Sequence, residues 1–444
     1  MHPPIQRPSR ARYAVLALAC SLSLITYLDR VAIMRARTDF ETHLGFSEEA
    51  MSLVFTAFTI GYALFEVPAG WMGDRWGARA VLTRIVLMWS LFTALTGAVW
   101  PFALGPLDAL GLMILIRFLF GAGEAGAYPN LARVAGDWFP ASERGFAQGS
   151  IWTAARLGGA VAPLVLGRLS ALVGWRGAFW VLGGIGVAWA AVFAWWFRDK
   201  PAQHPSVNEA ERAVIEEGKR PHQAGHAWPG WPTLLGSVSV VALCWASCWV
   251  CFGWYFYITW QPKYLEQVFG LDPKGVEIEI ATGLPFLFGA AGCFLGGRIS
   301  DSLSRRIGLR WGRSGVGLAG FLGAGACVLA AGWASHPWAA VGLLCAAFLI
   351  NDLAVPVMWA ASSDMGGRYA GSLAGLMNSV GAVGAILSPL LIPRMIGWLP
   401  QDWSHAERWR VIFVGLAGAW LLAAAAWPFV DASRRIEPSQ APAS

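Results

Sequence analysis

Charged residues are scarce in this sequence. Only 14% of its 444 residues are Asp, Glu, Lys or Arg, whereas 56% are hydrophobic, and the mean hydropathy is +0.50. Soluble domains of this size do not have such a composition. The shortage of charge therefore excludes an ordinary soluble protein and indicates a polytopic membrane protein. The net charge of +6 does not indicate nucleic-acid binding, because the basic residues lie in short loops between apolar runs.

The polar segments lack the motifs of an enzyme. They contain no histidine pair, serine elbow, phosphate-binding loop or metal cluster, and the longest of them is too short for a catalytic domain. The seven cysteines lie in apolar runs, and the single CxxC pair, Cys248 and Cys251, has no second pair to complete a metal site. We therefore expect no enzyme activity, no metal and no cofactor. The N-terminus lacks a small-residue cleavage site, so we also expect no removed signal peptide.

Apolar runs divide the chain into membrane-spanning segments. A helix needs about 20 apolar residues to cross a bilayer. Twelve segments meet this requirement, near residues 12–34, 50–72, 80–101, 106–130, 146–172, 177–197, 236–262, 278–299, 314–334, 338–360, 370–397 and 409–430. We predict an all-α membrane protein with twelve transmembrane helices. Basic residues concentrate on the side that holds both termini and the central loop, which predicts that this side faces the cytoplasm.

The longest polar interruption, residues 198–232, separates two halves of six spans. We predict an N-terminal bundle over residues 1–197, a cytoplasmic connecting loop over 198–235 and a C-terminal bundle over 236–444. Within the loop, Ser206 followed by Glu209 is a capping-box pattern, and it predicts a short helix that ends near Gly218. We interpret the loop as a solvated connector on the membrane surface.

A pattern of glycine, acid and arginine occurs twice. In both copies an acid follows a glycine by four residues and precedes an arginine by five, and the two acids lie 227 positions apart (301 − 74). This spacing indicates two parallel, pseudo-symmetric halves. The glycine lets two helices approach, and the acid can hold a base of a neighbouring helix; basic loops that only set topology are the alternative. The predicted gating motif consists of Gly70, Asp74, Arg75, Gly77 and Arg79 in the first copy and Asp301, Arg305 and Arg306 in the second.

Four charged residues lie inside two apolar spans. Asp29 and Arg30 belong to the first span, and Arg117 and Glu124 to the fourth. Each would cost about 2.5–3.5 kcal/mol if it faced lipid at mid-bilayer. We therefore expect all four to face protein or water and to surround a polar cavity. The alternative is a static charge network that only joins the two helices.

Several segments resemble a known family. GWMGDRWGAR resembles the loop motif of the major facilitator superfamily, and the resemblance covers the whole chain in its layout of two times six spans. TYLDR, YALFEVPAGW, RFLFGAGEAGAYPN, the WFP…ERG run and DMGGRYAGSLAGLMNSVG resemble its anion:cation symporter branch. That branch transports galactonate, glucarate and hexuronates, and it includes the vesicular glutamate and sialic acid carriers. The resemblance implies a major facilitator fold of two pseudo-symmetric six-helix bundles.

The resemblance also implies roles for individual residues. The acid and base of spans one and four would serve proton coupling and anion binding, and two further family positions fall on Tyr62 and Asn378. Family members often carry glutamine nine residues before the span-five proline. This chain has Ala154 there, and Arg156 lies nearby.

The chemistry of the residues supports such roles. An arginine in a cavity stays charged and offers donors that match a carboxylate, so we expect Arg30 and Arg156 to meet the substrate. Burial raises the pKa of an acid whereas a cation lowers it, so a carboxyl group can take a proton when substrate competes for its arginine. We assign proton coupling to Asp29 and Glu124, with Arg117 as the switching partner. The remaining substrate-binding candidates are Tyr27, Tyr62, Tyr255, Tyr257, Asp352, Ser362 and Asn378.

For most candidates in the second half, an alternative remains. Trp260 of span seven also suits an interfacial aromatic belt, and Asp352, Ser362 and Asn378 also suit ordinary contacts between helices.

We therefore predict a secondary transporter that carries a small organic anion together with a proton by alternating access. The expected anion is a sugar acid: an aldonate, aldarate or hexuronate. The alternatives are a proton-driven antiporter that exports a drug or metabolite, and a carrier of a non-sugar carboxylate such as an aromatic acid. Against export, Ala162 precedes Pro163, where exporters of this superfamily carry glycine. We expect a monomer in the plasma (inner) membrane, surrounded by lipid, with no nucleic-acid partner.

Overall fold

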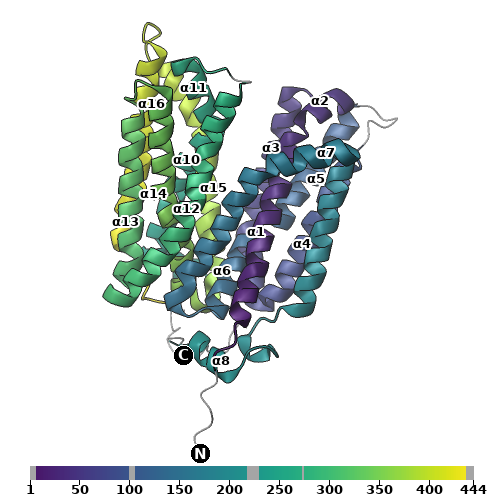
Figure 1. The fold of residues 1–444 in the computed structure, drawn as a ribbon, viewed down its shortest axis with the longest axis vertical. Coiled ribbons are helices and arrows are strands. Elements are labelled where there is room, and N and C mark those ends of the chain that lie inside the picture. The colour runs from purple at the N-terminus through teal and green to yellow at the C-terminus, as the bar shows by residue number, and fades with distance from the viewer. Residues whose placement is uncertain (1–6, 100–105, 218–229, 273–274, 437–444) are drawn as a thin grey trace, which may run out of the picture. The chain divides into compact units, whose positions relative to one another are not determined.

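The computed structural model describes residues 7–99, 106–217, 230–272 and 275–436, and every regular element in these ranges is helical (Figure 1). The long helices of the first half are α1 (Ala11–Arg35), α3 (Glu48–Trp76), α4 (Ala78–Gly97), α5 (Pro106–Glu124), α6 (Ala127–Trp138) and α7 (Arg144–Trp196). Those of the second half are α10 (Val238–Thr259), α12 (Val276–Ile307), α13 (Leu309–Ala331), α14 (Pro337–Gly366), α15 (Ala370–Trp398) and α16 (His405–Ala426). Short helices are α2 (Arg37–Leu44), α8 (Glu209–Glu216), α9 (Trp231–Leu235) and α11 (Gln261–Phe269).

The apolar runs account for the long helices, because a backbone in lipid must satisfy its own hydrogen bonds. Within the described residues, 10 helical stretches are long and apolar enough to cross a membrane. Two of them, with 56 and 62 residues, are each long enough for two crossings. If each of these two stretches crosses the membrane twice, the ten stretches make twelve crossings, as predicted. The prediction of an all-α protein is confirmed. The predicted end of the third span, residues 100 and 101, lies outside the described residues.

Glycines mark the breaks between consecutive helices. Gly174, at φ 72°, interrupts α7 between the predicted fifth and sixth spans. Gly126, at φ 85°, separates α5 from α6, so the predicted span of residues 106–130 is two helices rather than one. Glycine adopts these left-handed backbone angles without the steric penalty of other residues. The break at Gly126 leaves Glu124 as the last residue of α5.

The chain forms two compact units. The first comprises residues 1–141, 154–228 and 368–375, and the second comprises 142–153, 229–367 and 376–444. Two helices are therefore divided between the units. The beginning of α15 belongs to the first unit and its remainder to the second, whereas the beginning of α7 belongs to the second unit and its remainder to the first. The sequence does not indicate this exchange of helix ends.

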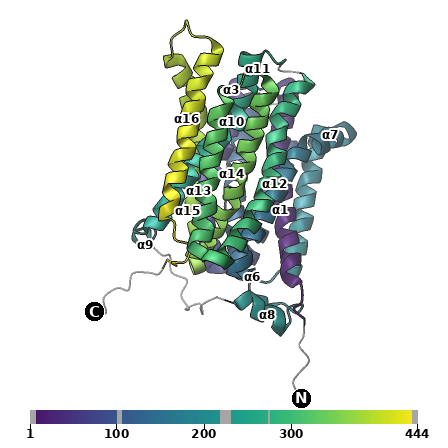
Figure 2. The same ribbon diagram turned by 60° about the vertical axis from the view of Figure 1, so that its left-hand side comes forward.

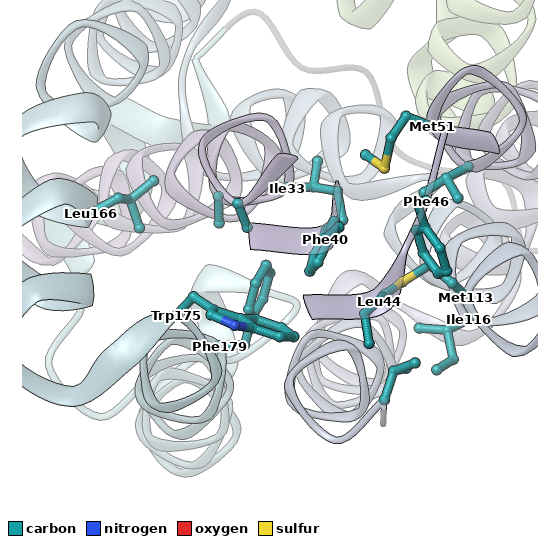
Figure 3. Packing of buried hydrophobic residues seen from close by; sticks show 14 of the residues in the cluster. Ile33, Phe40, Leu44, Phe46, Met51, Met113, Ile116, Leu166, Trp175 and Phe179 are labelled. Atoms are coloured by element: carbon teal, nitrogen blue, oxygen red, sulfur yellow. The ribbon is translucent and has the colours of Figure 1, made fainter. Parts of the chain in front are cut away.

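A hydrophobic cluster fills one end of the first unit. It gathers side chains from α1, α2, α3, α5 and α7, with Phe40 beside Trp175 and Phe179 (Figure 3). The ring centroids of Phe40 and Trp175 lie 5.1 Å apart in an edge-on arrangement. Leu28 and Ile116 belong to the cluster and directly precede Asp29 and Arg117 in the chain. The cluster thus fixes α1 and α5 at the level where their charged residues begin.

The described first part of the connecting loop, residues 198–217, belongs to the first unit, and its helix α8 lies near the start of α1 (Figures 1 and 2). Asn208, rather than the predicted Ser206, caps α8: its side chain accepts a hydrogen bond from Glu211 N at 2.9 Å. The carboxylate of Glu211 is buried and accepts hydrogen bonds from Ala11 N at 3.0 Å and Arg12 N at 3.1 Å. The loop thus caps α1 through one buried carboxylate, while Glu209, Arg212 and Glu216 of α8 are exposed. A position on the membrane surface stays a prediction. The predicted helix end near Gly218 lies outside the described residues.

The same loop also caps α4. Asp199 accepts a hydrogen bond from Arg79 N at 2.8 Å, and a side chain at Gly77 would collide with its carboxylate. The buried ring of His204 lies between Trp138 and Trp196, with ring centroids 5.6 and 4.4 Å away. Residues 199–211 therefore hold the first turns of two membrane helices.

Candidate transport site

Close contact between α3 and α5 sets the geometry of the charged residues in the first unit. Gly61 of α3 lies against the backbone of Phe118, and Gly121 of α5 lies against the backbone of Phe58. Neither position has room for a Cβ atom. The helices therefore approach to backbone contact, which brings Phe58 and its neighbours beside Arg117.

Arg30 of α1 forms an ion pair with Glu124 at the end of α5. Its Nε and Nη2 atoms both lie 2.6 Å from Glu124 Oε1. The Arg30 side chain is 25% exposed, whereas that of Glu124 is 1% exposed. The base is thus partly accessible and the acid is enclosed behind it.

Aromatic rings surround the Arg30 guanidinium group. Its central carbon lies 4.8 Å from the ring centroid of Tyr62, 5.7 Å from that of Tyr27 and 5.6 Å from that of Phe58. Tyr128 of α6 is a fourth ring, at 6.0 Å. Cation–π attraction stabilises a guanidinium group in such surroundings. Tyr27 and Tyr62 are half-buried, so they and Arg30 form the accessible part of the site.

Arg117 is buried and packs on aromatic rings, with its central carbon 4.4 Å from the Phe120 centroid and 5.0 Å from that of Phe58. Its Nε atom donates no hydrogen bond to any described residue. Sequence reasoning proposed Arg117 as the switching partner of the acids. In the structure, Glu124 contacts Arg30 instead, and Arg117 lies within electrostatic range of both Glu124 and Asp29.

Asp29 is 3% exposed, and within the described part of the chain neither carboxylate oxygen accepts a hydrogen bond. The charged groups that act on it are Glu124 and Arg117. Burying a carboxylate without a donor is unfavourable by several kcal/mol unless the charge is removed. This arrangement makes Asp29 a candidate for carrying a proton.

Arg156 of α7 is also buried, and its Nη1 atom donates to the Tyr27 hydroxyl at 3.4 Å. The structure therefore brings together the four charged residues predicted in spans one and four with Tyr27, Tyr62 and Arg156. All seven belong to the first unit.

The remaining substrate-binding candidates belong to the second unit. Asp352 is fully buried and accepts a hydrogen bond from Asn351 Nδ2 at 2.9 Å. The Tyr257 hydroxyl donates to Leu344 O at 3.3 Å, and Ser362 Oγ donates to Trp359 O at 2.8 Å. The Tyr257 hydroxyl thus joins α10 to α14, whereas the Ser362 hydroxyl bonds within its own helix, α14. Tyr255 and Asn378 are half-buried.

Asp74 of the first gating motif receives three kinds of donor within the first unit. Arg133 Nη1 lies 2.9 Å from Oδ1, and the backbone N–H groups of Gly371 and Ser372 donate at 3.0 and 2.7 Å. The Ser372 hydroxyl adds a bond of 2.6 Å. The acid thus sits at the N-terminus of α15, where the helix dipole favours negative charge.

Asp301 repeats this arrangement in the second unit. Arg313 Nη1 donates at 2.7 Å, and the N–H groups of Gly145 and Phe146, at the start of α7, donate at 2.9 and 2.6 Å. A further acid, Asp364, joins Arg313 at 3.1 Å and Arg144 at 2.6 Å.

The arginines named in the two motifs have other contacts. Arg75 is exposed and stacks over Trp71 at 5.4 Å, and Arg79 Nε donates to Ala194 O at 2.8 Å. Arg305 donates to Ser142 O at 3.0 Å, and Arg306 is exposed. The bases that contact the acids come from neighbouring helices, as the sequence predicts: Arg133 contacts Asp74, and Arg313 contacts Asp301. Arg144 and Asp364 lie inside segments that carried the family resemblance, which is the only sequence signal for them.

Comparison with known proteins gives a consistent result. The sequence model described as Major Facilitator Superfamily matches residues 19–389. The chain is 35% identical over 395 residues to a probable sulfoacetate transporter of Cupriavidus necator, covering 87% of this chain and 88% of that protein. It is 30% identical over 402 residues to a probable galactarate/D-glucarate transporter of Bacillus subtilis, covering 88% and 86%.

Solved structures share the fold. A proton:xylose symporter bound to 6-bromo-6-deoxy-D-glucose superposes with a TM-score of 0.69 at 15% identity, covering 96% of this chain and 98% of that one. The human organic anion transporter MFSD10 gives 0.66 at 16% identity, covering 96% and 100%. At these identities the likeness is one of fold alone.

Proposed function

The chain belongs to the Major Facilitator Superfamily, and on that premise we propose that it carries a small organic anion together with protons by alternating access. It is a multi-pass membrane transporter and not an enzyme. Relatives at 35% and 30% identity are named for sulfoacetate and for galactarate and D-glucarate, which supports an organic anion and favours a sugar acid or a similar small acid as cargo.

One observation carries this proposal: a partly exposed arginine is paired with an enclosed carboxylate. An arriving anion can reach Arg30 from its exposed side and compete with Glu124 for the same donors. Glu124 then loses its cation while it stays buried, and it is stabilised by taking up a proton. When the anion leaves, Arg30 pairs with Glu124 again and the proton is released. Anion binding and proton binding are thereby coupled.

Asp29 is the second proposed proton carrier. Because no described residue donates a hydrogen bond to its carboxylate, the neutral acid is the less costly buried form. Arg117, which lies within electrostatic range of both acids, would stabilise whichever one is ionised. Proton coupling is thus assigned to Asp29, Glu124 and Arg117.

The proposed substrate contacts in the first unit are Arg30, Tyr27, Tyr62 and Arg156, where phenol hydroxyls can meet hydroxyl or acidic oxygens. From the second unit we propose Tyr255 and Asn378, which are half-buried, and Asp352. Tyr257 and Ser362 stay candidates whose hydroxyls would have to exchange their present backbone partners.

The proposed gate consists of the Asp74 and Asp301 contacts, because each joins a helix end to the first turn of another helix. The proposed placement is a monomer in the plasma (inner) membrane, with both termini and the loop of residues 198–235 in the cytoplasm between bundles 1–197 and 236–444.

The direction of coupled proton flow tests the proposal. Purified protein in liposomes that enclose a pH-sensitive dye should acidify the lumen when sulfoacetate or D-glucarate is added outside. An exporter working by proton antiport would instead raise the luminal pH when substrate enters. Protein-free liposomes and the Glu124→Gln variant provide the baseline.

A further inference from the structure

We infer that the carried anion has two acidic groups, and that Arg30 and Arg156 each bind one of them, with Tyr27 between the two arginines. This inference rests on the proposed function, because it specifies which anions the same site selects.

Tyr27 contacts both cations. The Arg30 guanidinium carbon lies 5.7 Å from its ring centroid, and Arg156 Nη1 lies 3.4 Å from its hydroxyl oxygen. One side chain therefore contacts two guanidinium groups that come from different helices, α1 and α7. Guanidinium groups bind carboxylates and sulfonates through paired N–H donors. Two such groups beside one ring make a receptor with two anion-binding ends.

The position of Arg156 is fixed by the packing of α7 on α1. A Cβ atom at Gly158 would lie 3.0 Å from Leu24 O and 3.2 Å from Tyr27 Cβ, and one at Gly159 would lie 3.3 Å from Tyr27 Cδ1. The two glycines thus allow α7 to lie directly on the turn of α1 that carries Tyr27. Arg156 precedes them by two and three positions, so it belongs to the same contact and not to a flexible loop.

The charges of the two arginines favour a dianion. Arg30 and Arg156 stay ionised in any state, because a guanidinium group does not lose its proton in a protein. A dianion offers an acidic group to each of them, whereas a monoanion bound at Arg30 offers none to Arg156.

Matched pairs of anions test the inference on the purified full-length protein. D-Glucarate and D-gluconate differ by one carboxylate, and sulfoacetate and acetate differ by one sulfonate. Isothermal titration should show at least about tenfold tighter binding of the dianion in each pair. Arg156→Gln should weaken D-glucarate binding at least about tenfold and leave D-gluconate within about twofold.

The control is Arg168→Gln, which removes the same charge from an exposed position of α7 and should leave both affinities unchanged. Size-exclusion chromatography shows whether each variant is folded. If Arg156→Gln does not fold, the wild-type preference and the milder Arg156→Lys variant, which should bind D-glucarate with intermediate affinity, decide the question.

Equal wild-type affinity for the members of each pair would overturn the inference and leave anion transport intact. An unchanged preference for D-glucarate in Arg156→Gln, or in Arg156→Lys if only that variant folds, would overturn the assignment of the second anion site to Arg156. Binding of none of the four anions would count against the proposed function itself.

Discussion

Arg30 and Glu124 lie 94 residues apart in the chain, and two nitrogens of the one meet a single carboxylate oxygen of the other at 2.6 Å. This contact joins α1 to the end of α5 and places an accessible base in front of an enclosed acid.

Removing the charge of Glu124 should uncouple transport. Glu124→Gln cannot release a proton, so accumulation of anion against a gradient should be lost, while exchange of labelled for unlabelled anion continues. Uptake and counterflow in proteoliposomes measure the two activities. Glu216→Gln, in an exposed ion pair of α8, is the control. Normal accumulation by Glu124→Gln would remove Glu124 from the coupling mechanism.

Asp29→Asn should uncouple transport without loss of stability. Since no described residue donates to the Asp29 carboxylate, the substitution breaks no hydrogen bond there. Asparagine has nearly the shape of the neutral acid, which is the form that burial favours at this position, so the midpoint of thermal unfolding should stay about the same. By contrast, Glu124→Gln removes the ion pair with Arg30 and should lower the midpoint of thermal unfolding. A marked drop in the midpoint for Asp29→Asn would show that its carboxylate stabilises the fold.

Arg30→Ala should weaken anion binding strongly. Loss of one partner of a buried charge pair costs about 2–5 kcal/mol, which corresponds to a dissociation constant higher by a factor of about 30 or more. Arg30→Lys keeps the charge without the fork of donors and should bind with intermediate affinity. Titration with D-glucarate measures both. An unchanged affinity in Arg30→Ala would place the anion elsewhere.

Asp74→Asn should slow transport more than it weakens binding. Asp74 lies outside the charged site and accepts hydrogen bonds from Arg133 and from the first turn of α15. Charge-assisted bonds of this kind contribute about 1.5–3 kcal/mol, so the transport rate should change about tenfold or more. Asp137→Asn, the other acid on Arg133, is a matched control with a smaller expected effect. Equal rates for wild type and Asp74→Asn would argue against a gating role.

Glu211→Gln should destabilise the first unit. The carboxylate is buried and accepts from Ser9 Oγ, two backbone N–H groups and Arg12. Replacing it with a neutral amide that brings its own donors should lower stability by about 1–3 kcal/mol. Thermal unfolding measures the effect, and Glu209→Gln, exposed in the same helix, should show none. An unchanged midpoint in Glu211→Gln would mean that this cap contributes little.

The helices were predictable because about 20 consecutive apolar residues leave a backbone in lipid few alternatives. The charged residues were predictable for the converse reason: Asp29, Arg30, Arg117 and Glu124 stand out against apolar surroundings. Their partners were not. Arg117 lies in the same helix as Glu124 and was therefore an obvious partner from the sequence, whereas the contact of Glu124 with Arg30 depends on how α1 packs beside α5.

The same limit applies at the helix ends. The sequence predicted that Asp74 and Asp301 each hold a base of a neighbouring helix. It did not identify Arg133 of α6 and Arg313 of α13 as these bases, because many arginines near the helix ends are equivalent choices. At α8 the cap was misplaced by two residues, because Ser206 and Asn208 are both good capping residues. Only the hydrogen bond to Glu211 N distinguishes them.

The caps formed by Asp199 and Glu211 bear on the construction of chimeric transporters. A junction placed directly after Trp196 would replace the two carboxylates that hold the beginnings of α1 and α4, even though every membrane helix of the first half would be retained. Hybrids that exchange sequence halves between related carriers should therefore be joined beyond Glu216. Asp199 and Glu211 then stay in the same half as the helices whose first turns they cap.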